Sequence, residues 1–260
     1  MNSRLLALKC GEGSFVVTIR CNEILFQNIQ AIAFDKDGTL ADSATFLRTL
    51  AQRRSRLVDA QIPGVQEPLL LAFGVDRQWL NPAGLMAVGT RRENEIAAAA
   101  YVAETGRDWL GALKLVEKAF VQADASMTRK ADHTPLVEGA LSLLQRLSSA
   151  GVRLGILSSD TTANVQDFVQ RYELEPYFQL QMGTDGTLAK PDPKVLEQAC
   201  ACLGVSPQQT LVVGDSPVDI ELAQAAIAAG CIAVHRELDN TSHLSKADVV
   251  IQHFDQIQLG

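Results

Sequence analysis

The feature that most constrains the fold is an apolar segment that ends abruptly in two carboxylates. Residues 32–34 read Ile-Ala-Phe, and Asp35 and Asp37 follow directly, with a glycine and a hydroxyl next to them. A short apolar run bounded by turn residues is typical of a strand buried on both faces, as in the centre of a parallel sheet. Because ligands bind at the carboxyl ends of such strands, we expect both carboxylates to face a crevice. Asp and Gly are also favoured in simple turns, so the rest of the chain must show whether this segment is a turn or part of a functional site.

Strand and helix patterns alternate from Pro135 almost to the end of the chain. Apolar runs of strand length are separated by amphipathic stretches of helix length, which is the pattern of a parallel sheet with right-handed crossovers. Two of these runs end in polar residues, at Ser158 and at Asp215. The predicted fold class is therefore α/β, with a Rossmann-like parallel sheet as the core. The later strands are expected at 152–157, 178–182, 211–213, 232–234 and 249–251.

The stretch between the first strand and Pro135 has a different pattern. Helical spacing of apolar residues recurs there, interrupted by proline and glycine, and no convincing strand is found between residues 43 and 133. We expect helices at about 66–73, 92–105 and 108–130, after a first one that starts near Ser43. A helical block inserted into an α/β pattern predicts a separate small domain. The expected division is an all-helical cap at 43–133 and a core at 1–42 and 134–260, with a β-hairpin at about 14–27.

Composition narrows the function classes. The 260 residues carry a net charge of −7 and a pI near 5.1, which argues against nucleic acid as the main partner, since phosphate backbones bind clustered lysine and arginine. No window approaches the roughly 18 apolar residues of a membrane span, and the apolar run at 5–8 is shorter than the roughly 7–15 residues of a signal-peptide core. The five cysteines are scattered, as expected of reduced thiols. These features predict a cytoplasmic enzyme without a membrane partner and leave its oligomeric state open.

The carboxylate pair and three later segments resemble the motifs of one superfamily. The pattern Asp-x-Asp-Gly-Thr at 35–39 resembles motif I of the haloacid dehalogenase (HAD) superfamily, most of whose members are phosphatases. In the family's order, Ser158 matches motif II, Lys190 motif III, and Asp215 with Asp219 motif IV. The helical insertion resembles the C1 type of cap, found in phosphoglycolate phosphatase-like and β-phosphoglucomutase-like members.

The resemblance implies a catalytic role for four residues. Asp35 would attack phosphorus and form an aspartyl-phosphate, which splits the displacement into two easier steps. Asp37 would protonate the leaving alcohol and then deprotonate the water that hydrolyses the intermediate. Ser158 would donate a hydrogen bond to a phosphoryl oxygen, and Lys190 would place an ammonium group beside the transferring phosphoryl.

The resemblance also implies a Mg²⁺ site. Asp35, Asp215 and the main-chain carbonyl of Asp37 would provide hard oxygen ligands, and Mg²⁺ would keep several waters. Asp219 would support this metal as an inner or outer partner. A second role stays open for Asp219, because the segment from Ser216 to Asp219 also fits the start of a helix with a capping box. The predicted metal residues are thus Asp35, Asp37, Asp215 and Asp219.

Taken together, these features predict a Mg²⁺-dependent phosphatase of a small soluble phosphate ester, such as phosphoglycolate or a sugar phosphate. A phosphomutase with the same core stays open, because the motifs do not separate it from a hydrolase. Asp37 argues against a dehalogenase, because dehalogenases of this superfamily lack the second aspartate of motif I. All the essential groups are present, which argues against a catalytically silent binding protein. The chain departs from the family pattern in its amino-terminal hairpin and at Lys36, where many members carry an apolar residue. Arg91, Arg92 and His235 stay outside the predicted site.

Overall fold

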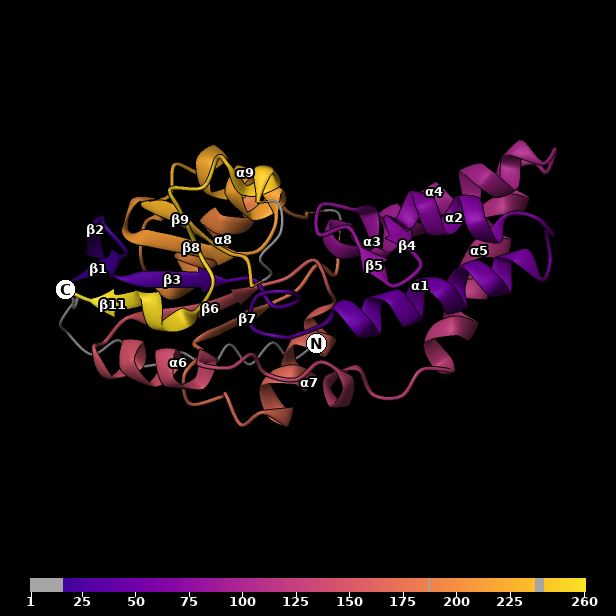
Figure 1. Cartoon of the computed structure of the whole chain (residues 1–260). Helices are drawn as coiled ribbons and strands as arrows, with labels where there is room; N and C mark the ends of the chain where they lie inside the picture. The colour runs from indigo at the N-terminus through magenta and orange to yellow at the C-terminus, as the bar shows by residue number, and fades with distance from the viewer. Residues whose placement is uncertain (1–15, 187, 237–240) are drawn as a thin grey trace, which may run out of the picture.

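A computed structural model describes residues 16–186, 188–236 and 241–260, and the chain forms two lobes (Figure 1). The larger lobe is built on a six-stranded sheet whose neighbouring strands are all parallel. The predicted α/β fold is therefore confirmed. From one edge to the other the strands are β10 (Val249–Ile251), β9 (Gly230–Val234), β8 (Thr210–Gly214), β3 (Ala31–Phe34), β6 (Arg153–Leu157) and β7 (Leu180–Met182).

Helices cover both faces of this sheet, as Figure 1 shows. Ile32 and Phe34 of β3 pack in one apolar cluster with residues of α6 (Ala140–Ser149) and α7 (Thr162–Arg171). Ala33, which points to the opposite face, packs with residues of α8 (Pro193–Leu203) and α9 (Pro217–Ala225). Burying one such large apolar side chain stabilises the fold by about 1.5–3 kcal/mol. The central strand is held firmly from both sides, so the loop that follows it starts from a fixed point.

A second, antiparallel sheet joins the two ends of the described chain. It consists of β1 (Val17–Cys21) between β2 (Ile24–Ile29) and β11 (Ile257–Leu259). The structure therefore forms the predicted hairpin, although residues 14 and 15 of the expected range lie outside the described residues. Ile19, Phe26 and Ile29 are buried in the same apolar cluster as the central strand. The hairpin thus extends the core of the larger lobe.

The smaller lobe is built mainly from helices around its own apolar core. All buried members of that core lie between Phe46 and Phe120. The two connections between the lobes run side by side, because Asp42 N donates to Pro135 O at 2.9 Å. This arrangement supports our proposal of a cap at 43–133. The helices are α1 (Ala44–Asp59), α2 (Gln66–Phe73), α3 (Leu85–Val88), α4 (Arg91–Glu104) and α5 (Trp109–Ala125).

The prediction that this block contains only helices is wrong. Two antiparallel strands of two residues each, β4 (Val75–Asp76) and β5 (Trp79–Leu80), follow α2. They are too short to produce an alternating pattern, and Gly74 and Arg77 turn the chain there with positive φ. The helix expected at 108–130 also ends earlier, at Ala125. None of the helices in the described residues has the length and apolar character needed to cross a membrane.

Short helical turns complete the fold and connect its elements. The first of them brings the chain back from the smaller lobe to the larger one, next to the predicted site. Ser43 stands at the start of α1 as expected, but its side chain makes no capping hydrogen bond. Asp192 does cap α8, accepting from Lys194 N at 3.0 Å. The short helical turns named at the start of this paragraph are 3₁₀ helices: η1 (Lys130–His133), η2 (Pro207–Gln209), η3 (Ser242–Leu244) and η4 (Phe254–Gln256).

Candidate active site

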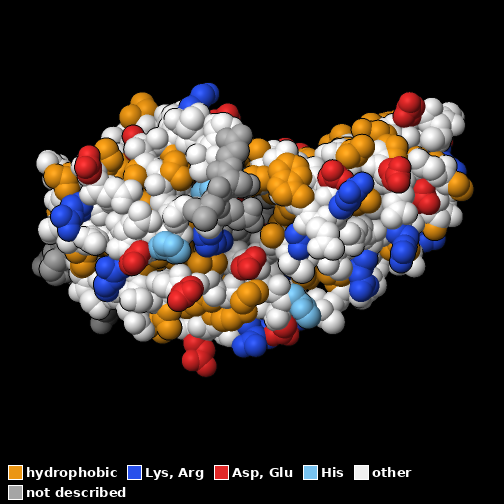
Figure 2. All heavy atoms as spheres, viewed as in Figure 1, with side chains coloured by type: hydrophobic (Ala, Val, Ile, Leu, Met, Phe, Trp, Pro, Cys, Tyr) orange, Lys and Arg blue, Asp and Glu red, His pale blue; other side chains and the backbone are white. Residues whose placement is uncertain are grey.

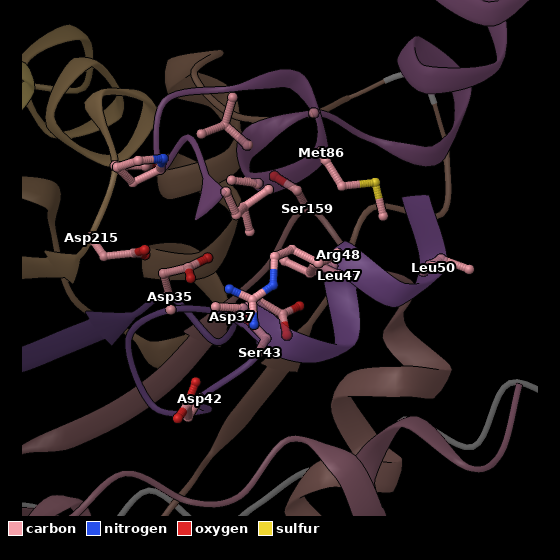
Figure 3. Close-up of a pocket in the computed structure, with 18 of the residues that line it drawn as sticks. Asp35, Asp37, Asp42, Ser43, Leu47, Arg48, Leu50, Met86, Ser159 and Asp215 are labelled. Carbon is pink, nitrogen blue, oxygen red and sulfur yellow. The ribbon is translucent and has the colours of Figure 1, made fainter. Parts of the chain in front are cut away.

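Three neighbouring strands deliver the predicted site residues to one edge of the sheet. In the register of the sheet, Phe34 of β3 lies opposite Ile156 of β6 and Val213 of β8. Asp35, Ser158 and Asp215 come shortly after these positions, at the carboxyl ends of the strands. Figure 3 shows the side chain of Asp215 pointing toward Asp35 at this edge. Residues far apart in the sequence are therefore gathered as we predicted.

Asp35 and Lys190 form a buried ion pair at the centre of the site. Lys190 Nζ donates to Asp35 Oδ1 at 2.6 Å and to Asp219 Oδ1 at 2.7 Å. Burial raises the pKa of Asp35 to about 7, although the ammonium group of Lys190 opposes the shift. For Lys190, the two carboxylates outweigh the effect of burial and raise its pKa. The lysine therefore stays charged beside the proposed nucleophile.

Asp219 serves Lys190 and a helix start in this structure. Its Oδ1 accepts from Lys190, and its Oδ2 accepts from Ser216 Oγ at 2.6 Å and from Ser216 N at 3.3 Å. Asp219 itself is only 2% exposed. Both oxygens accept hydrogen bonds from neighbouring side chains, so the role of Asp219 as an inner or outer partner of a metal stays a prediction. The capping role is seen in the structure, and Asp219 also holds the ammonium group of Lys190 in place.

Asp215 is held in place by the loop that follows β3. Thr39 Oγ1 donates to Asp215 Oδ1 at 3.0 Å. Burial, and then the negative charge of Asp35, raise the pKa of Asp215 well above its ordinary value. A Cβ atom on Gly38, whose φ is +87°, would lie 2.0 Å from Asp215 Oδ2. Glycine is therefore required here both by the backbone conformation and by the space that the carboxylate occupies.

Asp35 and Asp215 are the carboxylates that remain available to a divalent cation. Within residues 16–186, 188–236 and 241–260, no three histidine, cysteine or acidic side chains are grouped closely enough to hold a metal ion by themselves. Mg²⁺ needs fewer, because it commonly takes one or two carboxylates and keeps several waters. Burial raises the pKa of both carboxyls, and the negative charge of Asp35 raises that of Asp215 further, so a cation placed between them would relieve their repulsion.

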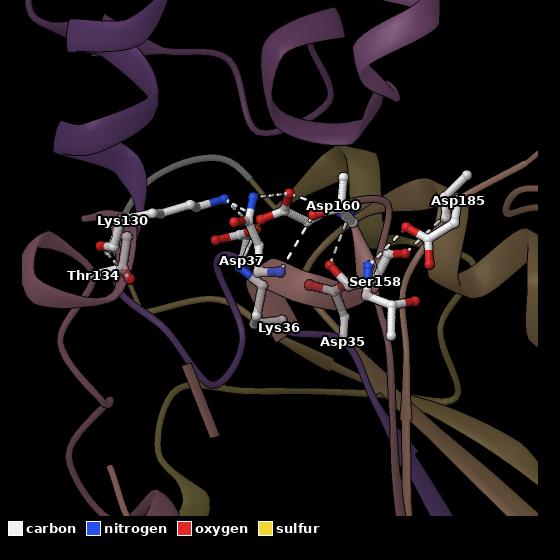
Figure 4. A network of polar contacts seen from close by, with 12 residues as sticks. Asp35, Lys36, Asp37, Lys130, Thr134, Ser158, Asp160 and Asp185 are labelled. Atoms are coloured by element: carbon white, nitrogen blue, oxygen red, sulfur yellow. Dashed lines mark hydrogen bonds and ion pairs between the residues drawn. The ribbon is translucent and has the colours of Figure 1, made fainter. Parts of the chain in front are cut away.

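The side chain of Asp37 points to two lysines. Its Oδ2 accepts from Lys36 Nζ at 2.6 Å and from Lys130 Nζ at 2.8 Å (Figure 4). Burial alone would raise the pKa of Asp37, but Lys130 and Lys36 outweigh it and hold this pKa below the ordinary value. Asp37 Oδ1 is buried and has no hydrogen-bond partner among the described residues. The carboxylate of Asp37, which we predict to be the general acid and base, is thus held through Oδ2 alone.

Ser158 is buried at the end of β6, where its hydroxyl faces the same cavity. Its Oγ accepts from Asp160 N at 3.1 Å, so the hydroxyl hydrogen is free to point to another acceptor. Ser158 and Ser159 both line the cavity, and Ser158 is 5% exposed. The position fits the predicted hydrogen bond to a phosphoryl oxygen.

A cavity of about 950 Å³ opens above these residues, between the larger lobe and the cap. Its floor carries Asp35, Asp37, Ser158, Lys190 and Asp215. Its cap side combines apolar residues, such as Leu47, Trp79 and Met86, with the charged residues Arg48, Arg54, Asp76 and Arg77. Figure 2 shows hydrophobic side chains of the smaller lobe gathered where the lobes meet. Arg91 and Arg92, which stayed outside the predicted site, do not line the cavity, because acidic residues of the cap bind them.

Sequence reasoning missed several charged residues at the site, among them Arg48, Arg54, Asp76 and Arg77 on the cap side of the cavity. Arg236 donates to the carbonyls of Gly38 and Thr39 and so supports the loop after β3. Lys36, Lys130 and Asp160 surround Asp37. Arg236 and Asp160 stand just beyond predicted strands, at the edge where the site was expected, which is a usable signal. Nothing in the sequence near Lys130 indicates its role, because it comes from a linker.

Comparison with known proteins assigns the family. A family model described as haloacid dehalogenase-like hydrolase matches residues 29–226, which is most of the chain and contains every predicted site residue. The chain belongs to this family. The prediction of a phosphatase-type enzyme of the HAD superfamily is confirmed.

Relatives of this HAD hydrolase include phosphatases of small metabolites. Phosphoglycolate phosphatase of Salmonella typhi is 28% identical over 246 residues, covering 89% of this chain and 92% of the relative. N-acetylmuramic acid 6-phosphate phosphatase of Pseudomonas putida is 28% identical over 232 residues, covering 86% and 92%. The solved structure of β-phosphoglucomutase from Clostridium difficile aligns with a TM-score of 0.59 at 18% identity, covering 88% and 93%. That structure shows the same fold.

The raised pKa of Asp35 predicts how the stability of the metal-free HAD hydrolase depends on pH. A carboxyl whose pKa is about 7 when folded and 3.8 when unfolded contributes stability below about pH 4 that is lost as the pH rises through 7. In EDTA, we expect Tm of the wild type relative to the Asp35→Asn variant to fall by roughly 5 °C or more between pH 5 and pH 8. Thermal scans of both proteins measure this difference, and a difference that stays constant with pH would contradict it.

Proposed function

We propose that this protein is a Mg²⁺-dependent phosphatase that hydrolyses a small soluble phosphate monoester through an aspartyl-phosphate on Asp35. The observation that carries the proposal is the ion pair between Asp35 and Lys190, directly beside Asp215, on the floor of a cavity that the cap covers. A nucleophile, a fixed cation and a second carboxylate for a metal are the parts that phosphoryl transfer requires.

Each residue has a defined part in two displacement steps. In the first, an Asp35 oxygen attacks phosphorus, the bond from phosphorus to the ester oxygen breaks, and Asp37 gives a proton to the leaving alcohol. In the second, water attacks the phosphorus of the aspartyl-phosphate, Asp37 takes the proton of that water, and phosphate leaves Asp35. Lys190 balances charge on the phosphoryl oxygens throughout, and Ser158 donates a hydrogen bond to one of them.

Mg²⁺ fits the donor set that the chain offers. Asp35, Asp215 and the main-chain carbonyl of Asp37 would hold it, with waters as the remaining ligands. When bound, the ion would withdraw charge from the phosphoryl oxygens as a Lewis acid. Gly38 supports this assignment, because any larger residue there would displace the Asp215 carboxylate.

The cavity and the relatives both support a class of substrate. A cavity of about 950 Å³ has room for a leaving group larger than a two-carbon acid. The relatives are named for phosphoglycolate and for an amino sugar phosphate, and we propose a small ester of one of these kinds. The four cysteines within the described residues are free thiols, which supports a reducing compartment such as the cytoplasm.

Removing the metal is expected to abolish phosphatase activity. Because a Lewis acid supplies several kcal/mol of transition-state stabilisation, kcat/KM for 4-nitrophenyl phosphate should fall at least about 10²-fold in EDTA. Excess Mg²⁺ should restore it. Ca²⁺ should restore it poorly, since it prefers six to eight oxygen ligands at longer distances.

The same experiment decides the proposed function. Phosphate release from a panel of metabolite phosphates with Mg²⁺ identifies the ester, and transfer between two positions of one sugar without release would indicate a phosphomutase instead. Unchanged activity in EDTA, or no release from any ester, would overturn the proposal.

A further inference from the structure

One positively charged side chain at the wall of the cavity has no partner. Within residues 16–186, 188–236 and 241–260, six lysines and arginines line the cavity. Five of them bind a carboxylate, a carbonyl or a hydroxyl: Arg48, Arg54, Lys130, Lys190 and Arg236. The sixth is Arg77, and no hydrogen bond or ion pair joins it to another described residue. Its guanidinium group is therefore available to a ligand.

Arg77 lies in the turn between β4 and β5, and this turn is fixed to helix α1. Arg48 of α1 donates to the carbonyl of Gln78, which follows Arg77 in the turn. The same guanidinium group donates to Thr45 Oγ1 at 3.0 Å, so Arg48 is itself held on its helix. Figure 1 shows β4 and β5 on the side of the smaller lobe that faces the larger one. The turn thus has a defined place on the cap side of the cavity.

The backbone at Arg77 has a conformation that arginine rarely adopts. Its φ is +52°, in the left-handed region where glycine and asparagine are the usual residues. Residues other than these are less stable there, and such positions are concentrated at functional sites. The stability of the turn therefore does not explain why an arginine stands at this position.

Two neighbours of Arg77 also line the cavity and limit what can bind there. Trp79 is 51% exposed and offers an aromatic surface to an apolar part of a ligand. Asp76 carries the opposite charge to Arg77, so the two charges largely cancel at a distance. An anion gains from Arg77 only when it contacts the guanidinium group directly. The hairpin is thus suited to one specific contact and does not attract anions in general.

We propose that Arg77 binds a carboxylate on the leaving group of the substrate, so that the enzyme selects acidic phosphate esters. A guanidinium group can hold a carboxylate through two parallel N–H bonds. One available cation balances one negative charge, which suits a carboxylate better than a second phosphate group with nearly two charges. The inference rests on the proposed function, because it assumes that Lys190 and a metal hold the transferring phosphoryl on the floor of the same cavity.

The test uses pairs of aryl phosphates that differ in charge and hardly in shape. One pair is 4-carboxyphenyl phosphate and 4-carbamoylphenyl phosphate, and the 3-substituted pair places the same groups at another angle. With Mg²⁺ present, we expect Arg77→Asn to lower the ratio of kcat/KM for the acid to kcat/KM for the amide in at least one pair. The expected decrease is about fivefold or more, the upper range for an ion pair accessible to solvent. The ratio is the readout because a loss common to both esters cancels in it.

Asparagine is the chosen substitute because it tolerates a positive φ. The hairpin should therefore keep its conformation, and Tm should not fall. Arg107→Asn is the matched control. Arg107 is another exposed arginine of the cap without a partner among the described residues, but it does not line the cavity. Both kcat/KM values should stay at the wild-type level in this control.

The outcomes separate this inference from the proposed function. Wild-type protein that hydrolyses none of the four esters with Mg²⁺ present would overturn the proposed function itself. Active wild type together with an unchanged ratio for both pairs in Arg77→Asn would overturn only the role of Arg77. A decrease in Arg107→Asn as large as that in Arg77→Asn would also overturn it, because any positive charge on the cap would then have the same effect.

Discussion

Replacing Asp35 by asparagine should lower kcat/KM for phosphate esters by about 10⁴-fold or more, because the amide cannot form the aspartyl-phosphate. The variant should remain folded. Asparagine has nearly the same shape, and it removes a buried carboxyl whose pKa burial has raised to about 7. Steady-state kinetics with Mg²⁺ and a thermal unfolding scan measure the two expectations.

Asp255→Asn is a suitable control for this experiment. Asp255 is an exposed residue of η4, remote from the cavity, and the substitution makes the same chemical change. It should leave kcat/KM at the wild-type value. Wild-type activity in Asp35→Asn would show that another group attacks phosphorus and would remove the basis of the proposed function.

Lys190→Met should reduce both activity and stability. Without the ammonium group, nothing fixed balances the charge on the transferring phosphoryl, and kcat/KM should fall by about 10³-fold. Asp35 and Asp219 would also lose the cation that each of them binds within 2.7 Å. Removing one partner of a buried ion pair typically costs about 3–5 kcal/mol, so the free energy of unfolding in EDTA should fall by that order.

The loss of stability in Lys190→Met should depend on pH. Without the lysine, the folded-state pKa of Asp35 rises further above its unfolded value, so stability is lost as the pH increases. Denaturant titrations should therefore show a smaller difference from the wild type at pH 5 than at pH 8. Lys194→Met, an exposed position four residues away, should show neither effect. Equal losses at both pH values would contradict this explanation.

Much of the site could be predicted because its geometry follows from topology. Asp35, Ser158 and Asp215 each end an apolar run, and parallel neighbouring strands bring their carboxyl ends to one edge whatever the details of the packing. The helices of the cap were predicted from the helical spacing of their apolar residues. The strands β4 and β5 were not predicted, because two residues are too few to show an alternating pattern. The prediction thus succeeded where a local hydrophobic pattern was long enough to be recognised.

The partners of charged side chains could not be predicted in the same way. The sequence indicates that Asp219 can cap a helix and support a metal, but its contact with Lys190, 29 residues earlier, follows from neither pattern. Lys36 reads as a departure from the family pattern, and its role depends on Lys130 and Asp160. Such pairings are set by distances between segments that have no local relation in the sequence.

By itself the sequence determined the α/β class, the inserted cap and the edge of the sheet at which the chemistry is proposed, since all three follow from hydrophobic periodicity and strand direction. Only the tertiary structure decided that Asp219 holds Lys190 and that one oxygen of Asp37 is anchored while the other is left without a partner. The physical reason is that hydrogen bonds and ion pairs act over about 3 Å, so their partners are known only when the chain is folded.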